Sequence, residues 1–158
     1  MNEKTRGIIT RVHKLLTARG ASIAVAESCT GGLLSHYCTL LPGSSQFFMG
    51  GVVAYSNRAK TEILGISPQT IQKFGSVSPE CALEMARRAK ALFGSDFALS
   101  TTGNLGPDVL EGKEAGLVFI ALAGETEKTG ELHLRGTREE NKEEAAYEAL
   151  KLLQESIK

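Results

Sequence analysis

Residues 26–34 limit the folds open to this chain more than any other part of the sequence. The apolar run at 22–26 precedes this stretch, and apolar residues at helical spacing follow it from Leu33 onward. A short buried strand that passes directly into a helix is the repeating unit of α/β folds. The turn between them contains Ser28, Cys29, Thr30, Gly31 and Gly32.

This turn predicts a place where catalytic and binding groups meet. It sets side chains beyond the carboxyl end of the strand, where the first N–H groups of the next helix also point. A nucleophilic Ser28 and N–H donors for an anion can therefore share one site. The alternative is structural, with Ser28 or Thr30 capping the helix and the two glycines allowing close packing. The stretch alone leaves both interpretations open.

Composition narrows the class of protein. A chain of 158 residues with 42% hydrophobic and 23% charged residues is typical of one soluble domain, here 1–158. Eighteen basic residues balance eighteen acidic ones, so no net field attracts nucleic acid, and we expect no nucleic-acid partner. No apolar run is long enough to cross a bilayer and the N-terminus is no signal peptide, which predicts a cytoplasmic protein without membrane contact.

Apolar periodicity and capping residues predict the helices. One ends before Gly20, one follows the Ser28 turn, one runs over 57–64 with Ser56 as its cap, and one closes the chain. Two more begin where Ser67-Pro68 and Ser78-Pro79 each place a capping hydroxyl before a proline at the first helical position.

The strands alternate with these helices. We predict strands over 47–55, which contains a glycine pair, and over 97–100, which delivers Thr101 and Thr102 into an irregular loop at 103–108. Segments 117–123 and 132–134 form a hairpin. This order predicts an α/β fold, a three-layer α/β/α sandwich with a mixed sheet.

Hydroxyl groups follow three of the predicted strands, at Ser28, Tyr55 and Thr102. Ligands of such folds bind beyond the carboxyl ends of the strands. A serine nucleophile without a histidine needs another base, and Lys60 is the candidate of suitable type. Its reference pKa of about 10.4 must fall to roughly 7–8 for that role. A solvated surface cation is the alternative for Lys60.

Other metal-binding or catalytic clusters are not indicated. His13, His36 and His133 lie in separate helical or strand patterns and are interpreted as ordinary surface or packing residues. Three scattered cysteines fit neither a disulfide framework nor a zinc site. We therefore expect no metal.

Longer motifs carry a resemblance to a known family. The segments AESCTGG at 26–32, PGSS at 42–45 and FMGGVVAYSNRAK at 48–60 closely resemble the CinA C-terminal domain family, the nicotinamide mononucleotide deamidases. Shorter matches at 64–65, 75–78, 102–103 and 106–107 keep the family order across nearly the whole chain. The first segment and the Tyr-Ser-Asn-x-x-Lys part of the third are the specific ones.

The resemblance implies a reaction and a set of site residues. The reaction is hydrolysis of the carboxamide of nicotinamide mononucleotide to nicotinic acid mononucleotide and ammonia, without metal or other cofactor. Ser28 is the implied nucleophile and Lys60 its general base, with Tyr55 and Thr102 in the active site. The developing oxyanion is expected to meet backbone N–H groups of 30–32 or the Thr102 hydroxyl. The expected substrate-binding residues are Thr30, Gly31, Gly32, Ser45, Asn57, Gly103, Gly106 and Lys142. The family fold is an α/β/α sandwich that forms dimers, so a homodimer is expected.

Two departures from the family pattern concern affinity and substrate choice. Residues 104–110 are bulkier than the small residues usual around the family's Gly-Pro pair, beginning with Asn104 and Leu105. Lys142 stands where a second arginine is common, and it would meet a phosphate as a point charge.

Three alternatives stay open at this point. The domain binds a nucleotide without converting it, Cys29 replaces Ser28 as the nucleophile, or the chain serves as an interaction module linked to competence or DNA damage.

Overall fold

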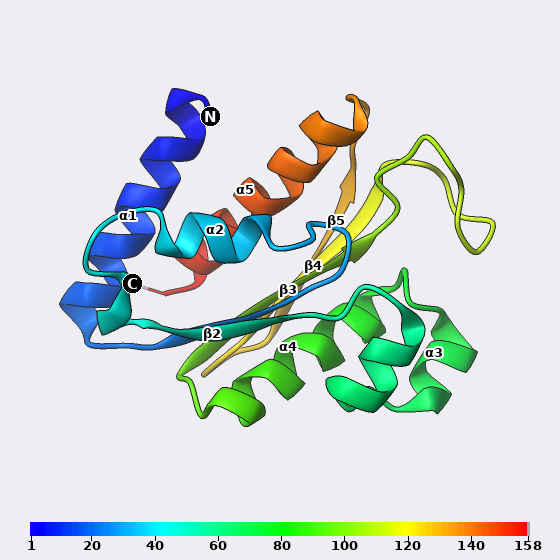
Figure 1. The fold of residues 1–158 in the computed structure, drawn as a ribbon, viewed down its shortest axis with the longest axis horizontal. Coiled ribbons are helices and arrows are strands. Elements are labelled where there is room, and N and C mark those ends of the chain that lie inside the picture. Colours follow the sequence, from blue (N-terminus) through cyan, green and yellow to red (C-terminus); the bar gives the residue numbers. More distant parts are fainter. Residues whose placement is uncertain (158) are drawn as a thin grey trace.

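A five-stranded sheet with helices on both faces forms the framework of the protein (Figure 1). The computed structural model describes residues 1–157. The strands are β1 (Ile23–Glu27), β2 (Phe48–Val53), β3 (Phe97–Gly103), β4 (Leu117–Ala123) and β5 (Lys128–His133). They lie in the order β2-β1-β3-β4-β5. Strands β2, β1 and β3 are parallel, while β4 is antiparallel to β3 and to β5. The predicted mixed sheet is confirmed.

The helices divide between the two faces of the sheet. Figure 1 shows α1, α2 and α5 on one side and α3 and α4 on the other. Their bounds are α1 (Glu3–Arg19), α2 (Leu33–Thr39), α3 (Pro68–Phe74), α4 (Pro79–Phe93) and α5 (Arg138–Ser156). A larger apolar core lies under α1, α2 and α5, and two smaller ones lie on the α4 side. The predicted α/β/α sandwich is therefore confirmed. None of the helices within 1–157 is long and apolar enough to cross a membrane.

Central position explains the composition of β1. All five of its residues are buried, because β2 and β3 flank it and helices cover both of its faces. Strand β2 lies at an edge of the sheet, and its residues alternate between half-buried and exposed. A continuous apolar strand and an alternating one are the patterns expected for these two positions. Since β1, β2 and β3 are parallel, their carboxyl ends meet at one edge of the sheet.

Several predicted boundaries differ from the structure. Strand β3 continues through Thr101 and Thr102 to Gly103, so these threonines belong to the strand. The two threonines stay in the strand because the pairing of β3 with β4 continues through Gly103. Strand β5 begins at Lys128, earlier than the predicted 132, and β2 ends at Val53.

Two predicted caps have different outcomes. Ser78 Oγ accepts a hydrogen bond from the Cys81 N–H, as predicted for a helix N-cap. Ser67 makes no such bond, because its hydroxyl donates to the Gln69 side chain. Its own N–H donates to the carboxylate of Glu84, which ties the start of α3 to α4.

Residues 57–64 form no ordinary α-helix. Ser56 Oγ does accept a hydrogen bond from the Ala59 N–H, as its predicted capping role requires. The segment Ala59–Ile63 then forms a π-helical turn, with the Leu64 N–H donating to the Ala59 carbonyl. Single π turns are uncommon and frequently occur at functional sites. This one carries Lys60.

Candidate active site

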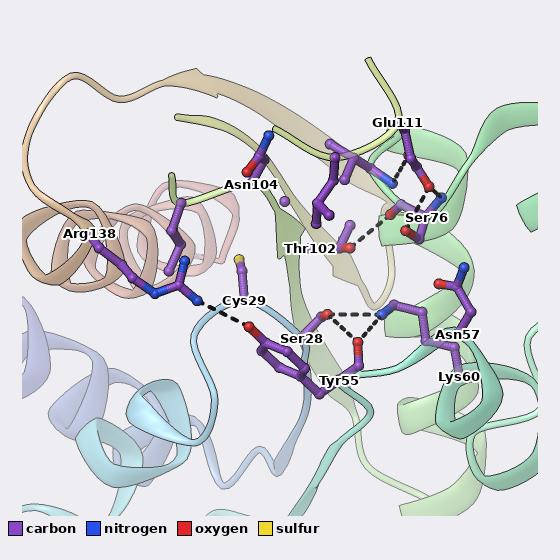
Figure 2. A pocket seen from close by; sticks show the side chains of 14 residues that line it. Ser28, Cys29, Tyr55, Asn57, Lys60, Ser76, Thr102, Asn104, Glu111 and Arg138 are labelled. Carbon is purple, nitrogen blue, oxygen red and sulfur yellow. Dashed lines mark hydrogen bonds between the residues drawn. The ribbon is translucent and has the colours of Figure 1, made fainter. Parts of the chain in front are cut away.

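Ser28 and Lys60 lie side by side beyond the carboxyl end of β1. Lys60 Nζ is 2.9 Å from Ser28 Oγ and donates a second hydrogen bond, also of 2.9 Å, to the backbone carbonyl of Tyr55 (Figure 2). Both side chains are buried, with 6% of Ser28 and 2% of Lys60 exposed. The predicted proximity of the alcohol and the amine is confirmed.

Burial lowers the pKa of Lys60 below its ordinary value of 10.5. Removal of the amine from water disfavours its charged form. The negative charge of Glu111 acts in the opposite direction, but it does not outweigh desolvation. No carboxylate of residues 1–157 forms an ion pair with Lys60. The amine is thus set up to lose its proton more readily than an exposed lysine.

Local backbone structure holds Lys60 in this position. Residues 54–56 leave β2, and the Ala54 N–H still donates to the carbonyl of Glu27 in β1. The Lys60 N–H donates to the Ser56 carbonyl, which starts the π turn beside the end of β1. The turn therefore directs the lysine side chain inward, toward the Ser28 hydroxyl and the Tyr55 carbonyl.

A cavity of about 250 Å³ opens above this pair. Residues from six segments of the chain line it (Figure 2). They are Ser28, Cys29, Tyr55, Asn57, Lys60, Ser76, Val77, Thr102, Gly103, Asn104, Leu105, Leu110, Glu111 and Arg138. Six of the predicted site residues are thus together: Ser28, Lys60, Tyr55, Asn57, Thr102 and Gly103.

The start of α2 differs from the sequence prediction. The carboxylate of Glu27, which is fully buried, accepts hydrogen bonds from the N–H groups of Gly32, Leu34 and Ser35. The expectation that these N–H groups are free for a ligand is therefore wrong. The alternative that Ser28 or Thr30 caps α2 is also wrong, because the helix has Gly32 at its N-cap without a side-chain cap bond.

Thr30 completes the Glu27 cluster. Its hydroxyl donates to Glu27 Oε1 at 2.6 Å and lies 2.6 Å from the hydroxyl of Thr101 on β3. Thr101 in turn accepts the Ser28 N–H through its carbonyl. These bonds tie β1, β3 and α2 together directly beneath Ser28. Thr30 is wholly buried and does not line the cavity.

The remaining predicted substrate-binding residues do not line the cavity. Gly31 is at the turn surface, where a Cβ atom would lie 3.6 Å from Lys142 Nζ. Gly106 uses its carbonyl to accept a hydrogen bond from Arg138. Ser45 is exposed in the short helical turn before β2, at the opposite end of the parallel strands from Ser28. Neither Gly31, Gly32, Ser45, Gly106 nor Lys142 is among the residues that line the cavity.

Glu111, Ser76 and Val77 form one wall of the cavity, which we call the carboxylate clamp. Glu111 accepts hydrogen bonds from the N–H groups of Ser76 and Val77 and from the Ser76 hydroxyl. Partial burial alone raises its pKa, but the bonds from Ser76 and Val77 outweigh that and lower it. The Ser76 carbonyl accepts a hydrogen bond of 2.8 Å from Thr102 Oγ1. The Thr102 hydroxyl expected at an oxyanion is therefore committed to the backbone.

Arg138 lies at the opposite side of the cavity from this clamp (Figure 2). Its guanidinium donates to the Gly106 carbonyl at 2.7 Å and to the Tyr55 hydroxyl at 3.1 Å. It is the first residue of α5, whose N-terminus is closed by a capping box of Thr137 and Glu140. Arg138 thus lines the cavity, whereas the expected Lys142 does not.

Sequence reasoning did not select Ser76, Asn104, Glu111 or Arg138 as site residues. Arg138 carried a signal, since the family pattern has basic residues at the start of this helix. No sequence pattern points to Glu111, because its hydrogen-bond partners lie 34 and 35 residues away in the chain. Within 1–157, no group of three or more His, Cys, Asp or Glu side chains is arranged to hold a metal ion.

Comparisons with known proteins agree with this architecture. Residues 5–157 match the family model described as the CinA C-terminal domain. The chain is 46% identical to a CinA-like protein of Chlorobium phaeobacteroides, over 92% of this chain and 36% of that protein. It is 45% identical to a CinA-like protein of Syntrophomonas wolfei, over 96% of this chain and 37% of that protein. The chain thus spans about a third of the length of these relatives.

Solved structures match over nearly the whole fold. Competence damage-inducible protein A of Klebsiella pneumoniae superposes with a TM-score of 0.93 at 33% identity, covering 96% of this chain and 95% of that one. A competence or damage-inducible protein of Enterobacter asburiae gives 0.95 at 28% identity, covering 99% and 100%. Since the family model and the relatives each cover most of the chain, the protein belongs to the CinA C-terminal domain family.

Proposed function

We propose that the protein is an amidohydrolase that cleaves the carboxamide of nicotinamide mononucleotide by a serine–lysine mechanism. The observation that carries the proposal is the 2.9 Å contact between Lys60 Nζ and Ser28 Oγ in a buried site. The substrate comes from the family resemblance. The names of the relatives mention competence, damage or CinA and no reaction.

The first half of the reaction forms an acyl-enzyme. Neutral Lys60 takes the proton of the Ser28 hydroxyl while Ser28 Oγ attacks the carboxamide carbon. The Tyr55 carbonyl can only accept, so it holds one N–H of the amine and leaves the nitrogen lone pair free for Ser28. The tetrahedral intermediate then expels its nitrogen, which receives the proton from Lys60 and leaves as ammonia.

One backbone group is assigned to the developing oxyanion. The N–H of Cys29, directly after the nucleophile, donates to no other residue within 1–157, and Cys29 lines the cavity. N–H groups aimed at the position where negative charge develops stabilise the transition state. Of the donors expected at 30–32, the Gly32 N–H donates to Glu27 and the Gly31 N–H donates to the Ser28 carbonyl.

Water completes the reaction. It loses a proton to Lys60 as its oxygen attacks the acyl carbon, and the Ser28–acyl bond breaks to release the carboxylic acid. Lys60 returns the proton to Ser28 Oγ. The phosphate of the nucleotide is assigned to Arg138, because a guanidinium offers several donors to phosphate oxygens in a planar fork.

The cysteine alternative has less support than Ser28. Burial raises the pKa of the Cys29 thiol to about 12, so almost no reactive thiolate forms near neutral pH. The amine of Lys60 contacts the Ser28 hydroxyl, and no hydrogen bond joins it to Cys29 within 1–157.

A dimer is part of the proposal. The resemblance implies both a dimer and a Ser45 close to the substrate. Ser45 and Ser28 lie at opposite ends of β1 and β2 within one chain. Ser45 can then reach only a substrate held by the second copy. Light scattering that gives a monomer at assay concentration would remove Ser45 from the site.

Ammonia release from nicotinamide mononucleotide tests the proposal. We expect activity in the wild type, none above background in Ser28→Ala, and unchanged activity in the control Ser156→Ala on the far end of α5. A wild type that binds the nucleotide by calorimetry and releases no ammonia would replace the enzyme with a binding module. Activity retained in Ser28→Ala and lost on thiol alkylation would transfer the nucleophile to Cys29.

A further inference from the structure

Asn104 is a buried amide in the cavity wall that the proposed mechanism does not use. It follows directly after β3, is 3% exposed and lines the same cavity as Ser28. Side chains two residues apart in an extended chain point to the same side, which puts Asn104 on the side of Thr102. Both residues line the cavity. Asn104 is also the first residue at which the sequence departs from the small residues usual in the family.

The hydrogen bonds of Asn104 fix which way its amide faces. Asn104 Nδ2 donates to the backbone carbonyls of Lys113 and Glu114, at 3.2 and 3.4 Å. A carbonyl only accepts, so the amide nitrogen must face these two groups and the oxygen must face away from them. Figure 2 shows the nitrogen at the outer side of the site and the oxygen toward the interior.

The amide oxygen has no partner. None of residues 1–157 donates a hydrogen bond to Asn104 Oδ1. Every fully buried polar side-chain atom in the same residues does have a partner. The Asn104 oxygen must therefore be reachable from outside, and the surface that Asn104 shows is the cavity wall. A fixed acceptor thus faces the space in which a substrate would lie.

The chemistry of the cavity limits what this acceptor can meet. The carboxamide that reacts must lie at Ser28, across the cavity from Asn104 in Figure 2. A phosphate monoester is mostly a dianion at neutral pH, with few protons to share with an acceptor, and it is assigned above to Arg138. The donors that remain on a nicotinamide nucleotide are the two hydroxyls of its sugar.

We propose that Asn104 Oδ1 accepts a hydrogen bond from a sugar hydroxyl of the substrate and makes the enzyme selective for ribosyl over deoxyribosyl nucleotides. The inference rests on the proposed function and names a residue that decides between substrates of that same site. An acceptor built to meet a hydroxyl discriminates strongly against an analogue without one, because the acceptor is left unpaired.

The proposal is tested by removing either the Asn104 amide or one sugar hydroxyl of the nucleotide. Ammonia release is measured for wild type and Asn104→Ala on nicotinamide mononucleotide and on its 2′-deoxy and 3′-deoxy analogues. In the wild type, kcat/KM should fall by about 10- to 100-fold for at least one analogue, as expected for an unpaired buried acceptor. Asn104→Ala should lose a similar factor on the natural nucleotide and lose little more on that analogue. Thermal unfolding of the variant checks that it folds.

Three outcomes separate the possibilities. Equal wild-type kcat/KM for all three nucleotides overturns the assignment, whatever the variant does. If a folded Asn104→Ala variant still prefers the natural nucleotide over the deoxy analogue, another residue binds the sugar hydroxyl. That result also overturns the Asn104 assignment. If the wild type releases no ammonia from any of the three, the proposed function fails. Calorimetric affinities for the same nucleotides then decide the Asn104 assignment, which predicts weaker binding of one deoxy analogue to the wild type and not to the variant.

Discussion

Glu27 and Lys60 are both buried ionisable side chains beside Ser28, but the protein gives them very different numbers of hydrogen-bond partners. Glu27 is fully buried and accepts five hydrogen bonds, from Thr30, Gly32, Leu34 and, twice, Ser35. Lys60 is 2% exposed, and its amine contacts only a hydroxyl and a backbone carbonyl among residues 1–157.

The difference separates a group that holds the fold together from the group that the proposed mechanism uses as a base. A buried carboxylate with a full set of donors ties together the elements that supply the donors. A buried amine without a carboxylate is destabilised in its charged form and becomes a base. Glu27 therefore supports the turn that presents Ser28, while we expect the buried amine of Lys60 to lower stability and, in the proposed mechanism, to act as the base. Three predictions test this contrast.

The largest expected effect is on catalysis. Lys60→Met should lower kcat for ammonia release by about 10²–10⁴, the usual contribution of a positioned general base. The matched control is Lys151→Met on the surface of α5, which should leave kcat unchanged. A folded Lys60→Met variant with a kcat within a factor of two or so of the wild type would remove Lys60 from the mechanism.

The next effect concerns stability at Glu27. Glu27→Gln keeps the size of the side chain but turns one acceptor oxygen into a donor that faces N–H groups. We expect the free energy of unfolding to fall by about 2–4 kcal/mol in urea denaturation. The control Glu155→Gln, at an exposed position, should change it by less than about 0.5 kcal/mol. Equal values for the two variants would mean that the Glu27 hydrogen bonds do not hold the turn.

The smallest effect has the opposite sign. Because burial lowers the pKa of Lys60 in the folded state, the unfolded chain binds more protons between the two pKa values. Wild-type stability should therefore rise as pH rises through the folded pKa toward 10.5. Lys60→Met removes this cost and should raise the free energy of unfolding at neutral pH by about 1–2 kcal/mol.

Urea denaturation at neutral pH and near pH 9.5 measures this difference. The gain in the variant should shrink at the higher pH. A Lys60→Met variant less stable than the wild type at neutral pH would show that the amine stabilises the fold.

The periodicity of apolar residues in the sequence was sufficient to predict the architecture. The continuous apolar run of β1, Gly20 after α1 and Ser78 before α4 each follow a local rule that the fold obeys. Local rules do not report tertiary pairing. Thr101 and Thr102 resemble loop residues in sequence, yet pairing with β4 keeps them in β3. The π turn at Ala59–Ile63 likewise departs from the helical pattern of its residues.

The same limit applies to the site. The pairing of Ser28 with Lys60 was predictable because both residues lie in specific motifs. The role of Glu27 was not, because a glutamate at the end of an apolar strand gives no sign that it turns back to the following helix. Asn104 and Glu111 lie on a loop whose path over the cavity depends on hydrogen bonds from Ser76 and from Asn141 of α5, which are far away in the chain.

The ionisation of Lys60 is the central claim, and NMR measures it directly. A titration of the Lys60 side-chain amine in the folded protein, followed through its Cε and Nζ shifts and assigned with Lys60→Met, gives its pKa. We predict a midpoint well below the ordinary value of 10.5, with a substantial neutral fraction at the pH where ammonia release is fastest. A Lys60 amine that stays fully protonated throughout the active pH range would contradict the serine–lysine mechanism.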